Sequence, residues 1–237
     1  SIHSNVARTT RLYIPVMLKK GLNELYIRPS GQVSVRLFFP AKPVQLNVQD
    51  ATVPVIEAGA AGNDSLQGAV VLINGSPRDL HNYEIRSVVG GKEITTEIPD
   101  VPAMSSRKVP FVFNGAGLAG KGQYHAALTL MYKGKKIDEQ ALAIGVAGPG
   151  GQYSVTFTSG IDGSLQYYAV TPQSPAGQMP ANKSALFLSV HGAGVEAIGQ
   201  ARAYHSKDWG TLVAATNRRP RGFNWEDWGR LDALEVL

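Results

Sequence analysis

The chain has 237 residues, which leaves room for one large domain or two smaller ones with a buried core. Apolar residues make up 43% and charged residues 17%, a balance typical of folded proteins, and 26 glycines with 14 prolines indicate frequent turns. The sequence contains no cysteine, so a disulfide scaffold, a cysteine-ligated zinc or iron–sulfur site and a thiol nucleophile are excluded.

The charge pattern and the hydropathy argue against two classes of partner. The formal net charge is +5, but the lysines and arginines are scattered apart from clusters at 133–136 and 218–221, so we expect no nucleic-acid partner. No apolar run approaches the roughly 18 residues that a membrane span requires. Residues 1–11 lack the apolar middle of a signal peptide, and we expect that they are not a leader.

Residues 11–148 show a period-two pattern of apolar positions, which predicts short β-strands. Turn signals separate the runs at Lys19 to Gly21, at Gly90-Gly91 and at Lys133 to Lys135. Strands at this spacing, with no helical stretch between them, predict an antiparallel β-sandwich over 44–148. Residues 1–43 contain two or three further strands, with Val33 to Phe39 alternating clearly; they either join the sandwich or belong to another domain.

The glycine-rich stretch from Gly148 to Gly151 predicts a domain boundary, and the pattern changes in residues 152–237. A hairpin comes first, with its turn at residues 160–163. Two continuous apolar runs follow, at 185–190 and 211–216, which are typical of parallel strands covered on both faces. Helices are predicted over 197–208 and over 227–237, so the fold class is mainly β followed by α/β.

Two motifs have simple structural interpretations. The segment from Gly115 to Gly120 fits G-x-G-x-x-G, but a strand pattern follows it in place of the helix that a phosphate site needs, so we predict a loop between strands. The five histidines show no chelating spacing. We therefore predict neither a metal nor a cofactor.

The segment His191-Gly192-Ala193-Gly194 is the best candidate for chemistry, because it ends a predicted strand and opens a crossover connection. Ligands of open α/β sheets gather at the carboxyl ends of strands. Glycines let the backbone approach a substrate, and the amides of Ala193 and Gly194 could donate to a developing oxyanion. The alternative is a plain tight turn with a packed histidine.

The arginine cluster of Arg218, Arg219 and Arg221 also has two interpretations. It could bind an anionic group of a substrate. The stronger alternative is an internal ion-pair network with nearby carboxylates at Glu226, Asp227 and Asp232.

Three stretches together, 157–170, 186–194 (LFLSVHGAG) and 217–237 (NRRPRGFNWEDWGRLDALEVL), resemble the opening of the α/β-hydrolase domain in prolyl-oligopeptidase-like serine hydrolases of bacteria. Residues 11–148 are more loosely similar to the β-modules that precede that domain. LKKGLNELYIRP resembles a strand pair of galactose-binding-like jelly rolls, and the part that follows is immunoglobulin-like.

This resemblance implies acyl transfer to peptide or ester substrates by Ser, His and Asp, in a secreted or periplasmic enzyme. The family's nucleophile lies in G-x-S-x-G, which occurs nowhere in this sequence. Only the oxyanion element, His191 to Gly194, carries over, and the resemblance implies Arg218, Arg219 and Trp225 as a pocket wall. We expect a serine hydrolase fragment without activity of its own.

The resemblance also implies a partner, because the strand at 185–190 would lack one neighbour. We expect the remaining sheet, or a second copy of the chain, at that open edge. Two alternatives stay open: a carbohydrate- or protein-binding β-sandwich, and a non-enzymatic assembly protein that docks through the edge. Sugar binding needs exposed aromatic platforms, yet all three tryptophans, Trp209, Trp225 and Trp228, lie after residue 152.

Overall fold

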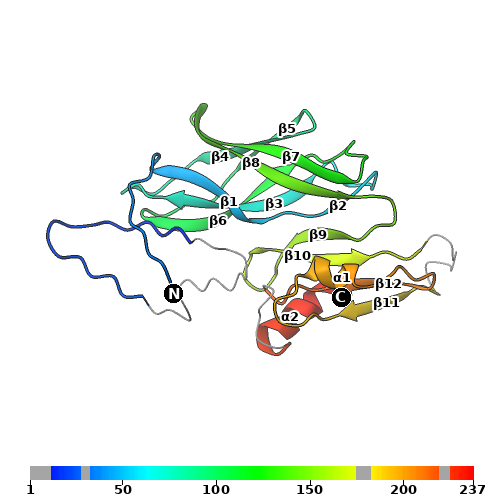
Figure 1. The fold of residues 1–237 in the computed structure, drawn as a ribbon. Coiled ribbons are helices and arrows are strands. Elements are labelled where there is room, and N and C mark those ends of the chain that lie inside the picture. Colours follow the sequence, from blue (N-terminus) through cyan, green and yellow to red (C-terminus); the bar gives the residue numbers. More distant parts are fainter. Residues whose placement is uncertain (1–11, 28–32, 175–182, 219–224) are drawn as a thin grey trace.

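The computed structural model describes residues 12–27, 33–174, 183–218 and 225–237. In these residues the fold is mainly β, with a β-sandwich stacked on a smaller mixed sheet (Figure 1). The elements in chain order are β1 (Val44–Thr52), β2 (Ile56–Glu57), β3 (Leu66–Asn74), β4 (Tyr83–Val89), β5 (Lys92–Glu97), β6 (Ser105–Phe113), β7 (Gly122–Tyr132), β8 (Lys135–Ala147), β9 (Tyr153–Thr158), β10 (Leu165–Thr171), β11 (Ala185–Ser189), α1 (Ala197–Arg202), β12 (Gly210–Ala214) and α2 (Asp227–Val236).

The sandwich consists of a three-stranded sheet in the order β1-β3-β6 and a five-stranded sheet in the order β2-β8-β7-β4-β5. All pairs are antiparallel except the short β2–β8 pair. The predicted hairpin turns are confirmed: Gly90-Gly91 joins β4 to β5, and Lys133-Gly134 joins β7 to β8. All four turn residues have positive φ, as two-residue hairpins with type I′ geometry require.

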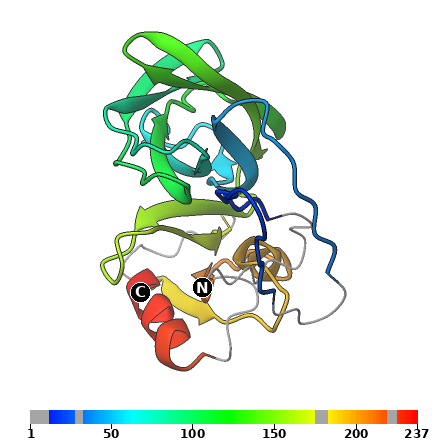
Figure 2. The ribbon, with the colours of Figure 1, turned by 90° about the vertical axis from the view of Figure 1, so that its left-hand side faces the viewer.

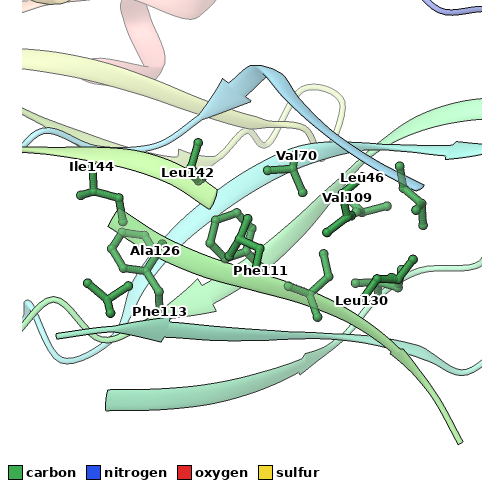
Figure 3. Close-up of a cluster of buried hydrophobic side chains, with 14 of the residues drawn as sticks. Leu46, Val70, Val109, Phe111, Phe113, Ala126, Leu130, Leu142 and Ile144 are labelled. Carbon is green, nitrogen blue, oxygen red and sulfur yellow. The ribbon is translucent and has the colours of Figure 1, made fainter. Parts of the chain in front are cut away.

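Alternating apolar residues of both sheets meet in one core (Figure 3). Val109, Phe111 and Phe113 of β6 are fully buried, and so are Ala126, Leu128 and Leu130 of β7. The period-two pattern therefore identified the inward faces of these strands correctly. The predicted antiparallel β-sandwich is confirmed as the fold class of this part of the chain.

The N-terminal segment differs from the prediction. Residues 12–27 and 33–43 contain no strand, although their apolar positions alternate. Lys19 and Asn23 do form the expected turn, through two hydrogen bonds between the Asn23 side chain and the Lys19 backbone. Val33, Val35 and Leu37 are more than half exposed, because no strand within the described residues pairs with this segment and none of them covers it as a second layer.

The smaller sheet has the strand order β11-β12-β10-β9. β9 and β10 form the predicted hairpin, β10 pairs antiparallel with β12, and β12 pairs parallel with β11. Figure 2 shows this sheet between α1 and α2. The predicted crossover helix is confirmed in kind but is shorter than 197–208, because α1 ends at Arg202.

The two edges of this sheet are in different situations. At the β9 edge, Ser154 exchanges hydrogen bonds with the backbone of Val55, and the Thr156 hydroxyl donates to the carbonyl oxygen of Gln67, so the sandwich covers this edge. β11, in contrast, pairs only with β12 among the described residues. The expectation that both apolar runs lie between two covered faces was wrong for β11, where Leu186 is 54% exposed.

Helix α2 also leaves apolar side chains uncovered. The predicted helix is confirmed, but Leu231, Leu234 and Leu237, spaced to lie along one stripe, are all exposed in the structure. Its buried positions are instead Gly229, Asp232 and Ala233. The helix thus packs on β12 by small residues and one carboxylate, and its leucine stripe has no partner in the described part of the chain.

Candidate functional site

The candidate site lies where β11 and β12 end. Because these two strands are parallel, their carboxyl ends reach the same edge of the sheet. His191 to Gly194, which we call the 191–194 turn, follows β11, and residues 215–218 follow β12. This is the edge at which open α/β sheets bind ligands.

His191 is buried at this junction, with 6% of its surface exposed. One ring nitrogen, Nδ1, lies 2.9 Å from the carbonyl oxygen of Gly192, and the other, Nε2, lies 3.1 Å from that of Thr216. Both oxygens can only accept hydrogen bonds. A neutral imidazole has one N–H and can donate to only one of these oxygens at a time, but the buried ring lies between the ends of β11 and β12 in contact with both.

Trp225 contacts both the backbone and the ring of His191. Its indole Nε1 donates to the carbonyl oxygen of His191 at 2.9 Å, and the two rings meet edge to face at 5.1 Å. Trp225 therefore lies beside the 191–194 turn.

The backbone of the 191–194 turn faces outward. Gly192, Ala193 and Gly194 are exposed, and within the described residues the amides of Ala193 and Gly194 make no hydrogen bond. The Val195 amide closes the turn on the carbonyl oxygen of Gly192 at 3.2 Å. Gly194 has φ +81°, a conformation that residues with a Cβ rarely adopt. Two N–H groups are thus available to an external acceptor.

Arg218 forms ion pairs with carboxylates of the same chain. Its guanidinium forms ion pairs with the carboxylates of Asp162 at 3.4 Å, Asp232 at 3.5 Å and Glu235 at 3.1 Å. It also donates to the hydroxyl of Ser159 at 2.7 Å. The ion-pair interpretation is therefore confirmed for Arg218 and Asp232.

Other expected members of this network are placed differently. Neither Glu226 nor Asp227 pairs with Arg218, while Asp162 and Glu235 take part without having been singled out in the sequence. Sequence reasoning had no signal for Asp162, which is 56 residues from Arg218 in the chain. Arg219 and Arg221 lie outside the described residues.

Burial and nearby charges shift the pKa values of two neighbouring groups, Asp162 and Tyr167. Burial raises the pKa of Asp162, but hydrogen bonds from Ser164 and the charge of Arg218 outweigh it and lower the pKa overall. Burial also raises the pKa of Tyr167, and the carboxylate of Glu196, which accepts a hydrogen bond from the Tyr167 hydroxyl at 2.6 Å, raises it further. Tyr167 therefore stays a neutral donor, tied to the residue just before α1.

The remaining features of the sequence form no further candidate site in the described part of the chain. Residues 115–120 connect β6 to β7 as the predicted loop, with a strand and no helix after it. No cluster in the described part of the chain brings three potential metal ligands together. Tyr83 and Tyr124 pack against the sandwich core, so neither provides a free aromatic platform. Neither described helix has the length and apolar character to cross a bilayer.

Comparison with known proteins gives no family. No family model matches the sequence, and no curated protein matches it. The CARDB domain of a Pyrococcus furiosus protein is 13% identical, with a TM-score of 0.29 over 48% of this chain and 99% of that one.

Two enzymes are similarly distant. A glycosyl hydrolase family 2 member from Bacteroides cellulosilyticus is 15% identical, with a TM-score of 0.29 over 63% of this chain and 19% of that one. A thermostable esterase is 12% identical, with a TM-score of 0.20 over 73% of this chain and 57% of that one. These similarities are too weak to assign a family or an activity.

Proposed function

We propose that residues 152–237 are the first part of an α/β-hydrolase catalytic layer in a bacterial serine hydrolase, and that the 191–194 turn supplies oxyanion donors. The observation that carries this proposal is the pair of unbonded, exposed N–H groups at Ala193 and Gly194, at the carboxyl ends of β11 and β12. Amides fixed in such a position stabilise negative charge that develops on a carbonyl oxygen. The resemblance of LFLSVHGAG to the corresponding family segment supports the same assignment.

The chemistry would be acyl transfer from a peptide or an ester. A serine oxygen attacks the carbonyl carbon while the histidine base takes the serine hydroxyl proton; the carbonyl electron pair moves onto oxygen, and the resulting oxyanion accepts hydrogen bonds from the turn. Collapse of this intermediate expels the amine or alcohol, which takes a proton from the histidine base. Since the sequence has no G-x-S-x-G, we assign the nucleophile and its base to polypeptide outside these residues.

The other parts of the chain receive roles that follow from this assignment. Residues 44–148 would be an accessory β-sandwich module, and the free edge of β11 would be covered by the rest of the catalytic sheet or by a second copy. Trp225 would line the site. Arg218 already satisfies internal carboxylates, which favours a supporting role over direct contact with substrate. We place the enzyme in a secreted or periplasmic location, on the resemblance alone.

Covalent labelling tests the proposal. The complete product of the gene is treated with a fluorophosphonate probe, and the labelled residue is identified by mass spectrometry. We expect one labelled serine outside residues 1–237, and neither labelling nor hydrolysis of a p-nitrophenyl ester by residues 1–237 alone. A labelled serine within residues 1–237, or a complete product without label and turnover, would contradict the proposal.

Removal of one donor tests the role of the turn. Ala193→Pro deletes an N–H that has no internal partner, and in the complete enzyme we expect it to lower kcat about 10²- to 10³-fold with little change in KM. Ala193→Ser keeps the N–H at the same exposed position and serves as the matched control. Equal rates in the two variants would exclude this amide as an oxyanion donor.

A further inference from the structure

Asp232 of α2 is the most deeply buried carboxylate near the candidate site, with 1% of its surface exposed. A buried carboxylate is costly unless its oxygens are well paired. Its Oδ2 accepts from the Thr216 hydroxyl at 3.0 Å and from the Arg218 amide at 3.3 Å. Its Oδ1 lies 3.5 Å from Nε of Arg218, an ion pair without a hydrogen bond, so only Oδ2 is hydrogen-bonded among the described residues. All of these partners belong to the segment that follows β12.

That segment has an unusual backbone. Asn217 and Arg218 are consecutive residues with φ of +55° and +57°, and neither is glycine. Such conformations cost roughly 1–3 kcal/mol each and persist only where the surroundings hold them. The Asp232 carboxylate accepts one hydrogen bond from the Thr216 hydroxyl, directly before this pair, and one from the Arg218 amide, within it. It is therefore placed to hold the strained segment in one conformation.

The strained segment in turn holds the 191–194 turn. The carbonyl oxygen of Thr216 lies 3.1 Å from Nε2 of His191, and Nδ1 of the same ring lies 2.9 Å from the carbonyl oxygen of Gly192. A continuous series of contacts thus leads from α2, through the end of β12 and the imidazole, to the backbone that presents the free amides.

We propose that Asp232 is a positioning residue for the 191–194 turn. It acts through the end of β12 and through His191, and it touches neither the turn nor a substrate itself. Its effect on catalysis rests on the function proposed above. Its effect on the position of His191 does not, and can be measured separately.

Glu235 provides an internal comparison. It lies on the same helix, three residues on, and forms an ion pair with the same guanidinium at 3.1 Å. Its remaining hydrogen bonds go to Ser159 and to the amide of Gly160, in the loop between β9 and β10. Its hydrogen bonds in the described part of the chain go to side chains and to the Gly160 amide, with none to the backbone amides of Thr216 and Arg218. Loss of its charge should therefore leave the 191–194 turn in place.

The test follows the indole N–H signal of Trp225 by NMR, because this group donates to the carbonyl oxygen of His191. The signal is assigned among the three tryptophans with Trp225→Phe. In Asp232→Ala we expect the signal to shift and its exchange with water to accelerate by about tenfold or more, since the hydrogen bond would open more often. Asp232→Asn keeps one acceptor oxygen, so we expect a smaller shift and slower exchange than in Asp232→Ala. Glu235→Gln should leave the Trp225 signal as it is in the wild type.

In the complete enzyme, Asp232→Ala should lower kcat by about tenfold or more with KM within about twofold, because misplaced donors weaken only transition-state binding. An unchanged Trp225 signal in folded Asp232→Asn and Asp232→Ala, or an equal shift in Glu235→Gln, would overturn the positioning role. A shifted signal in a complete protein that hydrolyses no ester or peptide would uphold that role and contradict the proposed function instead.

Discussion

Asp138 of β8 is the second deeply buried carboxylate, and it lies in the sandwich. It accepts a hydrogen bond from the Lys42 ammonium at 2.7 Å and another from the Leu46 amide at 2.8 Å. Burial by itself raises the pKa of this group, but these hydrogen bonds lower it overall. Asp138 therefore links the segment before β1 to the five-stranded sheet.

We predict that Asp138→Ala destabilises the protein by about 1–3 kcal/mol at pH 7, because the buried Leu46 amide loses its acceptor. Urea unfolding followed by circular dichroism measures the difference. Glu139→Gln is the control, because the neighbouring Glu139 forms its ion pair with Lys136 in solvent and should change nothing measurable.

The same carboxylate predicts a pH dependence with a definite sign. Its pKa is lower in the folded state than in the unfolded chain, so its contribution is fully present above the unfolded value of about 3.9 and is lost as the pH falls through the folded value. The stability difference between wild type and Asp138→Ala should therefore shrink below about pH 4. A difference that grows on acidification would contradict the ion pair.

At the scale of elements, β11 lacks the features that normally protect an edge strand. Its five residues carry no charge and no proline, and Leu186 and Leu188 are exposed by 54% and 36%. Natural edge strands avoid unwanted pairing with inward charges, prolines or bulges. The uncovered, apolar edge of β11 can therefore pair with another strand.

We predict that residues 1–237 alone self-associate as concentration rises, and that Leu186→Lys makes them monomeric, because a lysine on the edge opposes strand pairing. Size-exclusion chromatography with light scattering at several concentrations gives the mass. Leu234→Lys on α2 is the control, since Leu234 is 55% exposed, about the same as Leu186, but lies outside the sheet. A wild-type monomer at every concentration, or equal effects of the two lysines, would contradict association through β11.

The elements also show what sequence patterns can predict. Strands β4, β6 and β7 followed from local alternation, and the turns at Gly90-Gly91 and Lys133-Gly134 from their turn residues, because each of these strands buries one face against the opposite sheet. The same alternation at Val33 to Phe39 produced no strand, since pairing depends on a neighbour that local pattern does not specify. The apolar run of β11 was found, but its exposed edge depends on which strands complete the sheet.

At the candidate site, sequence position located the 191–194 turn but not its support. The end of a buried strand followed by glycines was visible in the sequence. The contacts of His191 with Thr216 and of Arg218 with Asp162 join residues 25 and 56 positions apart, and no local pattern encodes them. Long-range polar contacts of this kind depend on the packed arrangement of β9 to α2.

At the scale of the molecule, the sandwich and the smaller sheet have separate apolar clusters. Hydrogen bonds join them at β9, between Val55 and Ser154 and between Gln67 and Thr156. We propose that 44–148 and 152–237 are two domains joined through this edge. The sandwich then acts as a support that leaves the opposite edge, β11 and its following turn, free for the rest of a catalytic layer.

The most direct test of this account is a crystal structure of the complete gene product with a phosphonate bound covalently to its nucleophile. The account predicts that the phosphoryl oxygen lies about 2.7–3.1 Å from the amide nitrogen of Ala193 or Gly194, with His191 still joined to Thr216. A phosphoryl oxygen that is bonded elsewhere, with the 191–194 turn remote from the adduct, would contradict it.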